Sequence, residues 1–97
     1  MSRTSNQQSL KEVIDELIQA YRLKEGLDEV RLRNLWEQLM GNMIASKTMS
    51  INLKVDVLTI RLSSAVLRQE LLYKRDEIKK ALNEALETEV VKEVILC

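Results

Sequence analysis

A chain of 97 residues can form one compact domain but not two ordinary ones. It has no histidine and only one cysteine, Cys97, so it lacks the usual zinc ligands, the commonest general base and any internal disulfide. Its formal net charge is zero, yet residues 31–80 carry ten basic and five acidic side chains, while both ends are acidic. Because affinity for phosphates follows local charge, this basic middle segment favours a polyanionic partner.

The composition also limits the chemistry and the location that we expect. With two glycines, Gly26 and Gly41, the chain cannot build a Walker loop or a dinucleotide-binding fingerprint. No run approaches the ~20 apolar residues of a membrane span, and the polar residues 1–8 do not form a signal peptide. We expect a cytoplasmic, non-enzymatic protein without metal, cofactor, small-molecule substrate or membrane partner. It should consist of a disordered tail, residues 1–8, and a single domain, residues 9–97.

Two helices are expected before the first strand. Ser9–Glu12 is a capping box, and the apolar residues after it follow the 3.6-residue period up to a stop at Gly26. Asp28 is the expected N-cap of a second helix, which ends at Gly41. A lone tryptophan on the apolar face of such a helix is more often part of the core than an interaction anchor. We therefore expect Trp36 to be buried where the second helix meets the sheet.

Alternating apolar and polar residues predict a β-hairpin with strands over Met49–Val55 and Leu58–Ser63. Ser63 or Ser64 then caps one long helix, and the β-branched segment Val90–Leu96 is a third strand. The predicted fold class is α+β, in the order helix-helix-strand-strand-helix-strand, with a three-stranded sheet covered by helices on one face. The sheet is mixed if the third strand lies beside the second and antiparallel if it pairs with the first, and both arrangements remain open.

The middle of the chain resembles a bacterial family. A tryptophan on a helix is followed by a glycine, by a threonine that opens the hairpin, and by a Ser-Ser step into a helix. The residues are Trp36, Gly41, Ile44, Ala45, Thr48, Leu58–Ser64 and Leu67–Leu71. They are similar to the DciA-like domain, and the resemblance extends over about residues 9–97. It implies a fold similar to a KH domain and a role in assisting the replicative DNA helicase on single-stranded DNA through binding alone.

Two departures accompany this resemblance. The chain has Asp56 and Val57 at the hairpin turn, where the family usually has a glycine, so the turn type stays open. The GXXG loop with which true KH domains clamp nucleic acid is absent, since Gly41–Ile44 lacks the second glycine. Any contact with DNA should therefore be electrostatic, weak and nearly independent of base sequence.

Six basic side chains form the candidate nucleic-acid surface. Three fall within about 40° of one another on one flank of the predicted long helix, two lie on the outer face of the hairpin, and one precedes it. They are Lys47, Lys54, Arg61, Arg68, Arg75 and Lys79. Arginine suits bidentate contacts with phosphate, and lysine acts as a point charge. The competing interpretation is an ordinary solvated surface, which polar strand residues and helix charges also produce.

The opposite flank of the predicted long helix is acidic. Glu70, Glu77 and Glu84 repeat every seven residues, and Tyr73 is the aromatic residue expected to be exposed. These four residues are the candidate partner-binding set.

The charge pattern and the family resemblance lead to two candidate functions. The first is a replication accessory protein that binds single-stranded DNA weakly and assists loading of the replicative helicase. The alternative is a protein-interaction adaptor that binds no nucleic acid.

Overall fold

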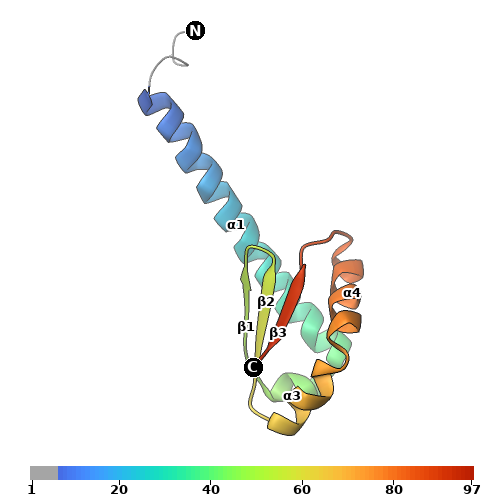
Figure 1. The fold of residues 1–97 in the computed structure, drawn as a ribbon. Helices are drawn as coiled ribbons and strands as arrows, with labels where there is room; N and C mark the ends of the chain where they lie inside the picture. Colours follow the sequence, from blue (N-terminus) through green and yellow to red (C-terminus); the bar gives the residue numbers. More distant parts are fainter. Residues whose placement is uncertain (1–6) are drawn as a thin grey trace.

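A computed structural model describes residues 7–97, and its longest element is helix α1, Gln7–Met40, of 34 residues (Figure 1). The predicted stop at Gly26 and the predicted N-cap at Asp28 are therefore wrong. A single glycine costs a helix only about 1 kcal/mol, and here an ion pair between Lys24 Nζ and Asp28 Oδ2, 2.7 Å apart, spans it. The helix also begins before Ser9, so the predicted capping box does not start it. Of the predicted tail, residues 1–6 lie outside the described residues.

Replacing Gly26 with alanine is expected to raise the free energy of unfolding by about 1 kcal/mol. A Cβ added at Gly26 meets no heavy atom within 4 Å, so the helix gains propensity at no steric cost. Chemical denaturation measures the change. Gly41→Ala is the matched control and should lower stability, because Gly41 has a φ of 90° that L-residues rarely adopt. A Gly26→Ala protein that is less stable than wild type would contradict a continuous α1.

Helix α1 ends before Gly41, as the sequence predicts, and the five-residue helix α2, Asn42–Ser46, follows. The predicted hairpin is confirmed as β1, Thr48–Lys54, and β2, Val57–Leu62, joined by a tight turn. The alternation of buried and exposed residues that was predicted for the first strand fails at both ends of that strand, because Met49 and Val55 are exposed. Met49 lies at an irregularity of the ladder, and Val55 occupies the turn with a φ of 60°.

The third strand, β3, Glu93–Leu96, pairs with β2 in parallel. The strand order is β1-β2-β3, so the sheet is mixed and the choice that the sequence left open is settled. The strand is shorter than predicted, because Val90 and Val91 precede it in an irregular segment. Asn83 holds this segment with two hydrogen bonds, accepting from the backbone N–H of Val91 and donating to its carbonyl oxygen.

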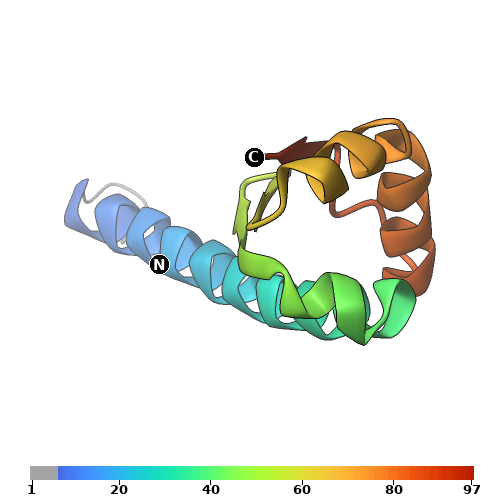
Figure 2. The ribbon, with the colours of Figure 1, turned by 90° about the horizontal axis from the view of Figure 1, so that it is seen from below.

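The predicted long helix is two helices, α3, Ala65–Leu72, and α4, Arg75–Leu86, which lie at a large angle to one another (Figure 2). Ser64 is the N-cap of α3 and accepts a hydrogen bond from Leu67 N–H at 3.2 Å. A straight helix over both segments would be about 33 Å long, whereas the longest strand spans only about 23 Å. The break at Tyr73 and Lys74 lets both halves stay on the core.

All the longer helices pack on one face of the sheet, and the predicted α+β class is confirmed. The other face is open to solvent. Trp36 is buried as predicted, with 2% of its surface exposed. Its Nε1 donates to Thr48 Oγ1 at 2.9 Å. The buried apolar core consists of Leu32, Trp36, Ile51, Leu53, Leu58, Ile60, Leu62, Leu71, Ile78, Leu82, Leu86, Val91, Val94 and Leu96.

Side chains of α1 cover the free edge of β1. Glu29 Oε2 accepts from the backbone N–H of Leu53 at 2.8 Å, and Glu25 Oε2 accepts from Val55 N–H at 2.6 Å. Arg33 donates to the carbonyl oxygen of Ile51 at 3.2 Å. An open strand edge invites pairing with another chain, and these contacts occupy it. They also fix the second half of α1 against the sheet, so the first half must project beyond it.

Candidate nucleic-acid interface and partner groove

Three of the six predicted basic residues belong to segments that join at one end of the sheet. The carbonyl oxygen of Lys47 accepts hydrogen bonds from Ser63 N–H and Ser63 Oγ, at 2.8 and 3.2 Å, which places Lys47 opposite the end of β2. Arg61 lies two residues before Ser63, and Arg68 lies one turn into α3. Lys47 and Arg61 are exposed and Arg68 is half-buried. We call Lys47, Arg61 and Arg68 the sheet-end cluster.

The other three basic residues lie apart from this cluster. Lys54 pairs with Val57 at the opposite end of the hairpin. It shares the open face with Arg61 but lies about 13 Å away along the strands. Arg75 and Lys79 are on α4, so they do not share a helix flank with Arg68. The single basic flank expected from a continuous helix is wrong, because the chain turns a corner between α3 and α4.

The open face of the sheet is mainly polar. Ser50 pairs with Arg61, and Asn52 pairs with Thr59. The hydroxyl and amide groups of these residues lie between the two cations of this face, Arg61 and Lys54. Glu93 contributes one acidic side chain beside Val57. Hydrogen-bonding groups flanked by Lys and Arg can contact a phosphodiester backbone without reading bases.

The corner between α3 and α4 presents an aromatic side chain beside two cations. Tyr73 is 81% exposed, and Lys74 and Arg75, which follow it, are also exposed. Exposed aromatic rings stack on unpaired bases, and neighbouring cations hold the backbone. Sequence reasoning identified Tyr73 as exposed but missed Lys74, because neither glycine nor proline marks this corner. The corner lies at the same end of the domain as the sheet-end cluster (Figure 1).

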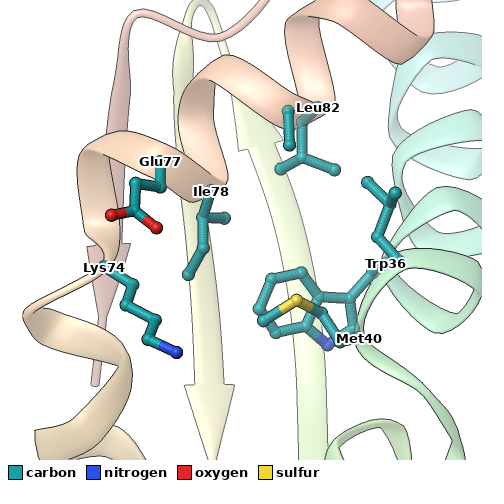
Figure 3. Close-up of a pocket in the computed structure, with 8 residues that line it drawn as sticks. Trp36, Met40, Lys74, Glu77, Ile78 and Leu82 are labelled. Atoms are coloured by element: carbon teal, nitrogen blue, oxygen red, sulfur yellow. The ribbon is translucent and has the colours of Figure 1, made fainter.

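A groove lies between α1 and α4 on the helical side of the domain. It has a volume of about 260 Å³, and Ile78 and Leu82 of α4 point across it toward Trp36 and Met40 of α1 (Figure 3). The remaining residues that line it are Leu39, Lys74, Glu77 and Ala81. We call this feature the α1–α4 groove.

The predicted acidic row is divided between the two helices. Glu77 lines the α1–α4 groove, and Glu84 lies two turns further along the same flank of α4. Glu70 is on α3 and does not continue this row. All three are exposed, as is Tyr73. Of the four candidate partner-binding residues, Glu77 therefore lines the groove, Glu84 lies further along the same helix, and the other two lie around the corner.

Within residues 7–97, no group of three or more His, Cys, Asp or Glu side chains could hold a metal ion. None of the helices in this part of the chain is long and apolar enough to cross a membrane. Cys97 is exposed, while its backbone continues the ladder with β2 by exchanging hydrogen bonds with Leu62 and Ile60.

A small α+β domain with a cationic sheet end, an exposed aromatic corner and an apolar groove has the features of a binding module. The chain belongs to the DciA family, because the family model described as Dna[CI] antecedent, DciA matches residues 9–96. The resemblance seen in the sequence is thus confirmed over nearly the whole chain. The family is associated with DNA replication and with loading of the replicative helicase, and it is not a known class of enzyme. No curated protein matches the chain.

Proposed function

We propose that this domain assists placement of the replicative helicase on single-stranded DNA by binding alone, with weak and sequence-independent contacts to the DNA. The observation that carries the proposal is the sheet-end cluster: the hairpin register sets Lys47 opposite the end of β2, near Arg61, and α3, which carries Arg68, follows β2 directly. Family membership supports the helicase as the second partner.

The chemistry of the cluster suits phosphates. Arg61 and Arg68 can each donate two parallel hydrogen bonds to a phosphate, and Lys47 adds a point charge. The open sheet face extends this surface toward Lys54 with polar side chains. At the corner between α3 and α4, Tyr73 supplies a stacking face beside Arg75, and Lys79 lies one turn further along α4. A strand following these groups would be held mainly by its backbone, so base sequence would matter little.

A fold similar to that of a KH domain, which the family resemblance implies, is part of this proposal. Since the chain lacks a GXXG loop, the basic side chains rather than loop amides would hold the nucleic-acid backbone. The domain would supply no bond-breaking chemistry. The free energy for placing the helicase would come from contacts and from the nucleotide cycle of the helicase.

Titration with single-stranded DNA over a series of salt concentrations tests the proposal. The logarithm of the affinity should fall linearly with the logarithm of the salt concentration, with a slope of about −0.7 for each phosphate neutralised. Homopolymers of different bases should give nearly the same slope, because phosphate contacts carry no sequence information. Absence of binding at low salt, or an affinity that salt does not change, would contradict a phosphate-binding surface.

The second candidate function is a protein adaptor that binds no nucleic acid. The observation in its favour is the α1–α4 groove, whose apolar walls include Leu39, 48% exposed, with Lys74 and Glu77 at its border. Apolar grooves with a few charged groups at the border suit a helical segment of a protein. The adaptor becomes the better account if the wild-type domain captures the helicase but binds no DNA in the titration above.

A further inference from the structure

The first half of α1 carries an apolar stripe that nothing in the described chain covers. The stripe lies within an arc of about 140° on the helix. It consists of Leu10, Val13, Ile14, Leu17, Ile18 and Tyr21. Each of these residues is between 44% and 65% exposed. We call these six residues the projecting stripe.

The helix that carries this stripe stands away from the domain (Figure 1). The molecule measures 60 × 24 × 20 Å, and its radius of gyration of 17.6 Å exceeds the roughly 13 Å of a compact domain of this length. Further along the same helix face, Leu32 and Trp36 are buried against the sheet. The apolar face of α1 is therefore continuous, but only its second half has a partner. Most of the stability of a protein helix comes from packing of its apolar face, and the projecting half of α1 lacks this packing within the described chain.

We propose that a second copy of this chain covers the projecting stripe, with the two helices antiparallel. Leu10, Ile14, Leu17 and Tyr21 are spaced four, three and four residues apart, which is the spacing of a helix-helix seam. In an antiparallel pair, Leu10 lies opposite Tyr21 of the second copy, and Ile14 lies opposite Leu17. Each apolar side chain of the seam then meets an apolar side chain.

The length of the projecting segment fits the antiparallel direction. From Gln7 to Lys24, where α1 reaches the domain, the helix rises about 26 Å, so a second copy of equal length fits in the antiparallel direction. Its first turns would reach the corner where α1 leaves the domain. This corner holds a cavity of about 160 Å³ bordered by Tyr21, Val55 and Val90, and Val55 is 64% exposed. Burial of both stripes removes roughly 1,000 Å² from water, which is the area a specific interface requires.

Sedimentation or light-scattering measurement of molar mass tests this pairing on the full chain. Wild type should have twice the 11.2 kDa mass of one chain, and Leu17→Glu, in the middle of the projecting stripe, should be monomeric. Leu23→Glu is the matched control, since Leu23 is 67% exposed on the other side of the helix, and it should remain dimeric. Thermal unfolding of both variants checks that the domain is folded. A monomeric wild type, a dimeric Leu17→Glu protein or a monomeric Leu23→Glu protein would each overturn the proposal.

Disulfide cross-linking tests the direction of the two helices. In a Cys97→Ser background, a Leu10→Cys chain mixed with a Tyr21→Cys chain should form mainly the mixed disulfide. Each variant alone should cross-link poorly, because its two cysteines lie at opposite ends of the seam. Efficient cross-linking of Leu10→Cys chains with one another would overturn the antiparallel arrangement.

Discussion

Replacing Trp36 with alanine should lower the free energy of unfolding by about 3–5 kcal/mol, as truncation of a large core aromatic does. Trp36 is buried where α1 meets the sheet. Its Nε1 donates to Thr48 Oγ1, and this hydroxyl donates to the carbonyl oxygen of Ile44 at 2.8 Å. The indole therefore joins α1 to the start of β1 and, through Thr48, to α2. Its loss opens a cavity and leaves the Thr48 hydroxyl without the donor from Trp36.

Chemical denaturation measures this loss, and Trp36→Phe is the informative control. Phenylalanine keeps most of the ring packing but cannot donate to Thr48. It should therefore destabilise less than alanine, and its own cost includes about 1 kcal/mol for the lost hydrogen bond. If Trp36→Ala unfolds at the same denaturant concentration as wild type while binding of a partner is lost, the tryptophan is an interaction anchor and not a core residue.

The elements that could be predicted are those set by local pattern. The period-two alternation predicted the hairpin, and the register that follows from it brings Lys47 and Arg61 together. Ser64 caps α3 through the hydrogen bond that its residue type favours, and Gly41 ends α1 because the chain needs a positive φ there. In each of these places the local preference and the packing agree.

The errors arise where tertiary contacts overrule a local signal. Gly26 followed by Asp28 has the pattern of a stop and a new start, but bonds from Glu25 and Glu29 to the edge of β1 keep α1 straight through this segment. The opposite error occurs at Tyr73 and Lys74, where no breaker residue is present but the core is shorter than a continuous helix. This corner also divided the predicted basic and acidic flanks, because positions on a helical wheel hold only within one helix.

The two proposed interfaces were accessible to sequence reasoning to different degrees. The basic residues could be named one by one, but their grouping depended on the hairpin register and on the direction of α3. The projecting stripe has an ordinary amphipathic pattern, so the sequence gives no sign that half of it lacks a partner. Its exposure follows from the position of Glu25, whose carboxylate accepts a hydrogen bond from the hairpin turn and so fixes where α1 is held by the domain.

The DNA affinity of a Lys47→Glu/Arg61→Glu protein, set beside that of a matched control, tests the central claim most directly. Both side chains are exposed, so reversing them should leave the fold intact. Lys80→Glu/Lys92→Glu is the control, because it changes the net charge equally at exposed positions outside the sheet-end cluster. Fluorescence anisotropy with single-stranded DNA at low salt gives the affinities.

The sheet-end variant should bind at least about tenfold more weakly than wild type, since a hydrogen bond to a charged group is worth about 1.5–3 kcal/mol, and the control should lose much less. The loss should be the same for every base sequence. If the two variants are weakened equally, binding follows net charge and not the sheet-end cluster, and the proposed interface is contradicted.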